Sequence, residues 1–277
     1  MFSRTATVAY RMATRYPSVT RVHTRSMASM DSYIKDRTPK SDSLLSKIQD
    51  SGAVGVQRYI TRVAQSTGQS LMTAGAVAGS IATMYHFGLP KELVLTGFGV
   101  GFVGGITSII KMGTDTVHVE EDEIGPYVVS SPSRKWWFNA FGVSEGLTIA
   151  PIICMFPAAA IPAALGTAGI VGGTAAAATL LPRGSTNWMG PPLFGCLLGM
   201  VGVGFANIFI GSPLLHSLDV YGGIGLFGLY TVYDTHQTIE DYEKGNLDHL
   251  NHSMNFTLNF INIFVRLIQI MGGKTSD

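Results

Sequence analysis

The chain has 277 residues, of which 46% are hydrophobic and only 13% are charged, whereas a soluble domain typically carries about 25% charged residues. The net charge of +1 provides no electrostatic field for nucleic-acid binding, and two cysteines in separate apolar runs provide no disulfide or metal framework. These values exclude a soluble α/β enzyme and a disulfide-rich scaffold, and they indicate a membrane protein.

The N-terminal segment differs from the rest of the chain. Residues 1–30 contain five arginines, several Ser and Thr residues and no acid, and they lack the apolar core of a secretory signal. This composition predicts a mitochondrial transit peptide; a basic amphipathic helix on a membrane surface is the alternative. Residues 31–62 are polar and mixed in charge, with Pro39 and Gly52 as breakers. They predict a matrix-side tail with one short helix around 44–48.

Long stretches without charge predict the membrane spans. Residues 63–90, 93–110 and 184–218 contain no Asp, Glu, Lys or Arg, and residues 136–182 contain only Glu145. A spanning helix needs about 20 mostly apolar residues, so these stretches indicate six spans. The expected spans are about residues 68–87, 92–111, 136–156, 158–181, 192–211 and 213–233.

The last apolar segment, about residues 252–271, carries a polar stripe. Asn255, Asn259 and Asn262 recur at i, i+4 and i+7 and therefore share a helical face. A helix of this kind hides its polar stripe inside a bundle. The predicted fold is an all-α membrane protein, a bundle of six to seven transmembrane helices with a central amphipathic last helix, in a domain that covers residues 63–277.

Two further patterns concern helix packing and the connection between the second and third spans. Gly97, Gly101 and Gly105 recur every four residues, which predicts the close approach of another helix. Residues 111–135 are predicted to form a polar loop. Its acidic run at 120–123 is either a solvated face or a device that attracts divalent cations.

Ionisable groups at membrane depth are the candidate functional residues. The sequence contains no hydrolase, zinc-protease, phosphate-loop or dinucleotide-binding motif, so we expect no enzyme activity, no cofactor and no resident metal. An acid at membrane depth costs about 2.5–3.5 kcal/mol and is a candidate functional group by default. Glu145, Asp219 and Asp234 qualify. A purely structural role remains the alternative for each of the three.

The C-terminal segment carries a family resemblance. Residues 229–271, LYTVYDTHQTIEDYEKGNLDHLNHSMNFTLNFINIFVRLIQIM, resemble the end of the Bax inhibitor (transmembrane Bax inhibitor motif) family. That family has a Tyr-Asp-Thr-Gln segment at the end of its sixth span and a Leu-Asp-Phe-Ile-Asn-like last helix. GVSEGLTIAPI at 142–152 and LGTAGIVGGTAAAATLLPR at 165–183 agree with earlier parts of the family. The resemblance covers about residues 63–271 and, with the transit peptide, points to the mitochondrial inner-membrane branch.

The resemblance implies an ion site with one departure from the family pattern. The family has two aspartates that are linked to proton sensing and calcium passage. Asp234 matches the first aspartate, the second maps to Asn259, and Asn255 also stands where some members carry an acid. An amide oxygen can coordinate a cation but cannot titrate. Proton coupling would therefore pass to Asp234 alone, to Glu145 or to His236, which replaces the usual Gln.

The function implied by the resemblance is a calcium leak channel or cation/proton exchanger of the mitochondrial inner membrane, linked to cell survival. Its expected partners are the lipid bilayer, calcium and protons, and possible inner-membrane proteins. The alternative is a non-conducting inner-membrane protein that organises membrane shape or partner complexes. Arg58 and Arg62, before the first span, favour the matrix for the N-terminal tail, whereas the loop at 236–251 does not decide the topology.

Overall fold

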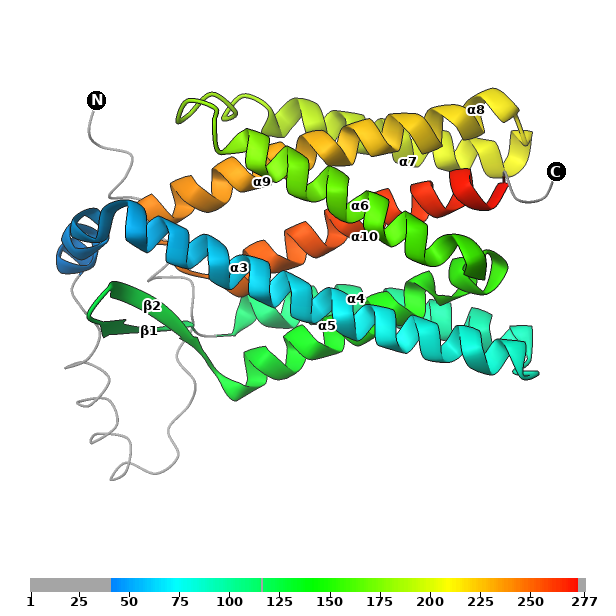
Figure 1. Ribbon diagram of the computed structural model, residues 1–277, viewed down its shortest axis with the longest axis horizontal. Helices are drawn as coiled ribbons and strands as arrows, with labels where there is room; N and C mark the ends of the chain where they lie inside the picture. Colours follow the sequence, from blue (N-terminus) through cyan, green and yellow to red (C-terminus); the bar gives the residue numbers. More distant parts are fainter. Residues whose placement is uncertain (1–40, 116, 274–277) are drawn as a thin grey trace. The chain divides into compact units, whose positions relative to one another are not determined.

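The computed structural model describes residues 41–115 and 117–273, which form helices and one β-hairpin (Figure 1). The predicted transit peptide at 1–30 and residues 31–40 of the predicted tail lie outside the described residues. In chain order the helices are α3 (Ser41–His86), α4 (Lys91–Thr114), α5 (Pro132–Met155), α6 (Pro157–Ala178), α7 (Gly190–Ile210), α8 (Pro213–Ser217), the π-helical η1 (Leu218–Gly222), α9 (Gly223–Glu243) and α10 (His249–Gly273). The strands β1 (Val117–Asp122) and β2 (Gly125–Ser130) pair antiparallel.

The helices confirm the predicted class of an all-α membrane protein. Within the described residues, five helices are long and apolar enough to cross a membrane, namely α4, α5, α6, α7 and α10. The first predicted span lies in the second part of α3. The sixth corresponds to α8, η1 and the beginning of α9. These two segments carry more polar residues, because α3 includes Gln, Ser and Thr and α9 continues into an acidic stretch.

The helices alternate in direction, so one end of the bundle collects several connections (Figure 1). There the hydroxyl of Ser253 donates to the carbonyl of Val63 at 3.0 Å, which joins α10 to α3. Arg183 pairs with Glu243 at 3.3 Å, which joins the loop after α6 to the end of α9. We call this the hairpin end, since β1 and β2 also lie there. The loop at 236–251 and the segment that carries Arg62 are thus on the same side.

The last helix occupies the centre of the bundle, as predicted. α10 packs against α3, α6 and α9, and it is continuous from the hairpin end to the opposite end. At that opposite end Gly272 lies directly against the ring of Phe156, at the junction of α5 and α6. The apolar core around α10 includes Ile149, Ala163, Ile261, Phe264 and Ile268.

The predicted glycine contact is present between α4 and α5. A Cβ atom on Gly101 would lie 2.6 Å from the backbone oxygen of Ser144 and 2.7 Å from the Cβ atom of Leu147, so only glycine fits there. Gly97 and Gly105 also face α5. A Cβ atom on Gly97 would lie 3.7 Å from the nearest side-chain atom of α5, and one on Gly105 would lie 3.3 Å from it, so these two contacts are less close. Close approach therefore depends chiefly on the middle glycine of the three.

A second glycine contact, which the spacing of glycines in the sequence did not reveal, joins α5 to α3. A Cβ atom on Gly146 would lie 2.6 Å from the carbonyl oxygen of Ala74 and 2.7 Å from the Cβ atom of Val77. Because α5 has glycine contacts on two sides, it is the helix against which both α3 and α4 are held.

The prediction that residues 111–135 form a polar loop is wrong. They contain the end of α4, the β-hairpin and the beginning of α5. The hairpin forms because β2 has an alternating pattern of buried side chains, and Val128 packs with Tyr59 and Val63 of α3. The predicted tail also differs, since α3 is helical from Ser41 and is interrupted only at Gly52, where φ is 52°.

Candidate ion and proton site

Asp234 lies inside the bundle and contacts Asn259. Asp234 is on α9 and 8% exposed, and Asn259 is on α10 and 4% exposed. The amide nitrogen of Asn259 donates a hydrogen bond to Oδ2 of Asp234 at 2.6 Å. The two residues that the family resemblance singled out, 25 positions apart in the chain, are therefore direct neighbours.

The orientation of the amide decides what the pair can do in this state. The Asn259 NH₂ group faces the carboxylate, whereas cation coordination would use its carbonyl oxygen. A cation held jointly by both side chains would require the amide to rotate. The structure therefore shows an acid that is satisfied by a neutral donor, with no shared proton between two carboxyl groups.

His236 points away from this pair, toward α6. Its Nε2 atom lies 2.8 Å from the carbonyl oxygen of Ala178. A carbonyl oxygen can only accept, so Nε2 carries the proton. Nδ1 is buried and has no hydrogen-bond partner among the described residues. The structure therefore places His236 on the helix of Asp234 but in a different contact.

Glu145 and Asn255 are not part of the Asp234 contact. Glu145 is half-buried on α5 and lines a cavity of about 840 Å³ between α4, α5 and α10. Asn262 and Gln269 line the same cavity, but Asp234 and Asn259 do not. Asn255 is exposed, one turn of α10 before Asn259. Of the predicted site residues, the structure thus brings together only Asp234 and Asn259.

Asp219 takes part in an ion pair that was not predicted from the sequence. Nη2 of Arg266 lies 3.1 Å from Oδ1 of Asp219, and Nε of Arg266 donates to the backbone oxygen of Asp219 at 3.0 Å. The guanidinium group passes directly over Gly223, where any side chain would collide with it. These contacts support the structural role for Asp219, because they fix η1 to α10.

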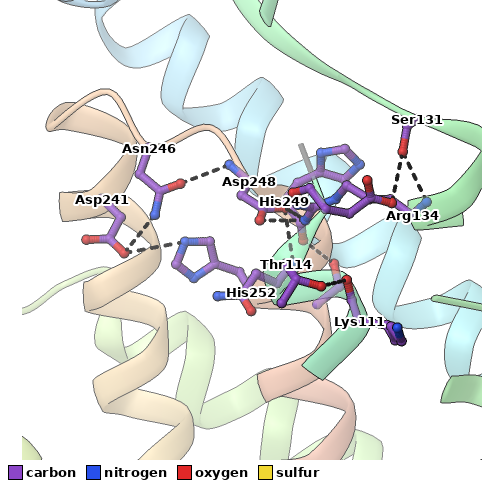
Figure 2. Close-up of polar contacts among 12 residues, drawn as sticks. Lys111, Thr114, Ser131, Arg134, Asp241, Asn246, Asp248, His249 and His252 are labelled. Carbon is purple, nitrogen blue, oxygen red and sulfur yellow. Dashed lines mark hydrogen bonds and ion pairs between the residues drawn. The ribbon is translucent and has the colours of Figure 1, made fainter. Parts of the chain in front are cut away.

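A polar network at the hairpin end was also missed (Figure 2). Arg134, at the start of α5, is 2% exposed and donates to both carboxylate oxygens of Asp248 at 2.6 Å. Ser131 caps the same helix by accepting from the backbone nitrogen of Arg134. The partners are 114 residues apart, and nothing in a single sequence indicates such a pairing. The network fixes the start of α5 to the start of α10.

His252 lies between Asp241 and Thr238, and Figure 2 shows its contact with Asp241. Nε2 of His252 lies 3.6 Å from Oδ2 of Asp241, and its Nδ1 lies 3.2 Å from the hydroxyl of Thr238. That hydroxyl donates to the backbone oxygen of Asp234 at 2.7 Å, so Nδ1 of His252 is the donor to Thr238. With the proton on Nδ1, Nε2 of the neutral imidazole cannot donate to Asp241 and has no hydrogen-bond partner among the described residues, so the chain of hydrogen bonds to the turn of Asp234 begins at His252.

Glu240, near the end of α9, holds the loop after α6 in place. Glu240 accepts from the backbone nitrogen of Gly184 at 3.0 Å and from Nζ of Lys244 at 3.0 Å. The hydrogen bond from Lys244 lowers the pKa of Glu240 below its ordinary value of 4.5. In the described part of the chain, no group of three or more His, Cys, Asp or Glu side chains could hold a metal ion.

Comparisons with known proteins identify the family. A family model described as "Inhibitor of apoptosis-promoting Bax1" matches residues 56–276. The chain is 32% identical over 140 residues to Bax inhibitor 1 of Arabidopsis thaliana, covering 49% of this chain and 57% of that protein. It is 24% identical over 254 residues to Bax inhibitor 1 of Drosophila melanogaster, covering 90% and 94%. It is 29% identical over 152 residues to the growth hormone-inducible transmembrane protein of Rattus norvegicus, covering 50% and 43%.

The fold and the comparisons together define the class of protein. The chain is an all-α protein of the lipid bilayer. In its central helix α10, Asn259 contacts the buried acid Asp234. The chain belongs to the Bax inhibitor family, whose description links it to the inhibition of apoptosis. In the matches to the first curated relatives, the chain spans just over half of their length, 57% and 58%.

Proposed function

We propose that this protein is a calcium leak channel or cation/proton exchanger of the mitochondrial inner membrane, with a linked role in cell survival. The observation that carries the proposal is the buried contact between Asp234 and Asn259. An acid in the interior of a membrane bundle is expensive and is usually retained for transport or proton transfer. The lipid bilayer, calcium and protons are the partners that this proposal requires.

The proposed mechanism uses one titrating group instead of two. In a pair of carboxylates, two coupled protonation steps give a steep response to pH. Here Asn259 stays neutral, so the site responds to one proton. When that proton is lost and the amide rotates, the carboxylate and the amide oxygen together form a site for a hard cation such as calcium.

The test is calcium flux in proteoliposomes that contain the full chain, measured across a range of pH. We expect Asp234→Asn to abolish the flux and Asn259→Asp to give a steeper response to pH than the wild type. Glu92→Gln is the matched control, because it changes an exposed acid on α4 to its amide and should leave the flux unchanged. Equal flux through wild type and Asp234→Asn would place the transport site elsewhere.

The second candidate is a non-conducting protein that organises inner-membrane shape or partner complexes. The observation that favours it is the closed state of the pair, in which the Asn259 amide satisfies the acid and neither residue lines a described cavity. If neither wild type nor Asp234→Asn conducts but Asn259→Asp does, the structural role is correct. That outcome would mean that the transport site has lost its second acid.

Three observations support the proposed mitochondrial location and topology. The chain is similar to the growth hormone-inducible transmembrane protein of rat, and its first 30 residues have the composition of an import signal. Basic residues also concentrate at the hairpin end, which the positive-inside rule assigns to the matrix. They are Arg58, Arg62, Lys111, Arg134, Lys135, Arg183 and Lys244.

A further inference from the structure

The large cavity between α4, α5 and α10 lies inside the membrane part of the bundle, apart from the Asp234 contact. Its volume is about 840 Å³. Its lining runs along α5 from Glu145 to Met155 and along α10 from Leu258 to Gln269, which corresponds to about 15 Å of helix. Both its volume and its mostly apolar lining are typical of a site for a small ligand, since such sites span roughly 300–1,000 Å³.

Glu145 is the one acid among the described residues that line this cavity, and its carboxylate has no partner among the described residues. A Cβ atom on Gly105, which also lines the cavity, would lie 3.3 Å from Oε1 of Glu145, so the carboxyl group points from α5 toward α4. Neither oxygen is among the fully buried polar atoms without a partner, so both keep accessible surface. An unpaired carboxylate at membrane depth is costly, and a cationic group that reached it would stabilise it.

Two polar neighbours of the acid in the cavity wall are engaged elsewhere. The hydroxyl of Thr148 donates to the carbonyl of Ser144 at 2.9 Å. The amide nitrogen of Asn262 donates to the carbonyl of Leu258 at 2.9 Å, and its amide oxygen accepts from Nη1 of Arg266 at 3.3 Å. Neither side chain donates to the acid, so the place beside the carboxylate is open to a ligand.

The charges around the cavity favour an organic cation. No Lys or Arg is among the described residues of the lining, and exposed His216 is the other residue there that can carry charge. Arg266 is paired with Asp219. Calcium takes about six to eight oxygen ligands, usually with several carboxylates among them, whereas an ammonium group can pair with one carboxylate. A single acid in an apolar cavity therefore suits a protonated amine better than a calcium ion.

The depth of the acid indicates what kind of molecule carries the amine. Glu145 lies about 20 Å along α5 from Pro132 and about 15 Å from Met155, which is near the middle of the bilayer. The headgroup of a phospholipid stays at the membrane surface and would not reach it. On the α4 side, Phe102 and Ile106 line the cavity and are 57% and 47% exposed, so an apolar molecule could enter from the lipid.

We propose that this cavity binds a small lipophilic amine, whose ammonium group pairs with Glu145 and whose apolar body contacts the side chains of α4 and α10. Pairing compensates the buried acid, and the apolar lining accepts the rest of the ligand. The inference goes beyond the proposed transport function and does not depend on it, because Asp234 and Asn259 do not line this cavity.

The test is binding of dansylcadaverine, a primary amine on an apolar fluorescent group, to the purified full chain in a non-ionic detergent. N-acetyl-dansylcadaverine, which lacks the charge, is the matched probe. The readout is the saturable rise in fluorescence above that of micelles without protein. We expect the wild type to bind the amine at least about tenfold more tightly than the acetylated probe, since only the amine pairs with the buried acid. Equal affinities, or no saturable binding of the amine, would overturn the proposal.

The first variant removes the charge of the acid and keeps its size. Glu145→Gln should weaken binding of the amine at least about tenfold and leave binding of the acetylated probe unchanged. Its melting temperature without ligand should be unchanged or higher, because the carboxylate has no partner to lose among the described residues. Glu92→Gln, at an exposed acid of α4 outside the lining, is the control and should bind both probes like the wild type. Unchanged binding of the amine by Glu145→Gln would contradict the proposal.

The second variant fills the cavity. Ile106→Trp should weaken binding of both probes, because the larger side chain occupies the space of their apolar body. Val100→Trp is the control, since Val100 is an exposed residue of α4 outside the lining. Equal binding by these two variants would show that the probes bind elsewhere. Displacement of the amine by millimolar calcium chloride, but not by sodium chloride of the same ionic strength, would assign the acid to a metal ion and likewise overturn the proposal.

Discussion

Two buried charges in this bundle are satisfied in different ways. Asp234 is matched by a single neutral donor, whereas Arg134 is matched by a carboxylate that accepts through both oxygens. A carboxyl group with a neutral partner can gain a proton without leaving a buried opposite charge behind. Arg134 has an opposite charge as its partner, so removing either member of the pair leaves an unpaired charge behind. The first arrangement suits a titrating site and the second suits an anchor.

The anchoring role of Arg134 makes a quantitative prediction. Arg134→Gln leaves Asp248 without its cation and should lower the free energy of unfolding by about 3–5 kcal/mol, as for other broken buried ion pairs. Arg183→Gln is the matched control, because it breaks a half-exposed ion pair at the same end and should cost less than about 1 kcal/mol. The measurement is chemical unfolding in detergent micelles. Equal losses in the two variants would refute the assignment.

Glu240 predicts how stability depends on pH. Its pKa is lowered by Lys244, so its contribution to stability is complete above the ordinary value of 4.5 and is lost as the pH falls through its folded pKa. Glu240→Gln should therefore reduce stability near neutral pH by about 1.5 kcal/mol, since the hydrogen bonds involve a charged acceptor. The difference between wild type and variant should shrink below pH 4.5. A difference that grows on acidification would contradict the assignment.

At the residue scale, the sequence predicted what a single helix or a family pattern can reveal. Asp234 and Asn259 were identified from a family pattern, and their hydrogen bond agrees with it. Arg134 with Asp248 and Arg266 with Asp219 were missed, because each pair joins segments far apart in the chain. The roles of Asp234, Asn259, Glu145, Asn255 and His236 in an ion site stay predictions.

At the scale of elements, helix length and packing followed from patterns of small and apolar residues. α3 ends at His86, in agreement with the expected end of the first span at about residue 87, and Gly88 follows with a φ of 101°, where side chains other than glycine are strained. The β-hairpin was missed because its first strand carries the acidic run, which suggests a solvated loop when it is considered alone. The alternating residues of β2 and the glycine turn were the available signals.

The contact between α4 and α5 can be tested with two glycines on the same helix. Gly101→Leu should disturb the contact, because even its Cβ atom would lie 2.6 Å from Ser144, and we expect a loss of stability of about 1–3 kcal/mol or more. Gly99→Leu makes the same change where nothing lies within 4 Å and should be nearly neutral. Thermal unfolding monitored by size-exclusion chromatography would compare them. Similar melting temperatures would argue against close packing at Gly101.

At the scale of the whole bundle, the arrangement of the helices decides which connections lie at the same end. Among the described residues outside the spans, most basic residues lie at the hairpin end, whereas the other end has Lys91, the first residue of α4. The sequence alone left the loop at 236–251 undecided because its acids outnumber its bases. Tyr242 of this segment packs against Tyr59 of α3, and Glu243 pairs with Arg183 after α6, so the segment lies on the side of Arg62.

This orientation can be measured by thiol labelling in mitoplasts, after replacement of Cys154 and Cys196. A membrane-impermeant maleimide should label Lys91→Cys readily and should label Glu123→Cys, in the hairpin turn, only after detergent is added. Both positions are exposed, so access to the reagent is the main difference between them. The opposite pattern would reverse the topology, and the absence of both proteins from mitochondria would contradict the proposed address.

The two contacts between α10 and the segment from Asp219 to Asp234 limit how these helices can separate. Asn259 holds Asp234, and Arg266, two turns further along the same helix, holds Asp219. A sideways separation of α9 from α10 would have to break a buried hydrogen bond and an ion pair at the same time. A pivot about Arg266 would have to open at the hairpin end, where Thr238 of α9 is hydrogen-bonded to His252 of α10 and a short connection joins Glu243 to His249. The contact between the two helices is therefore held at both ends as well as at Asn259.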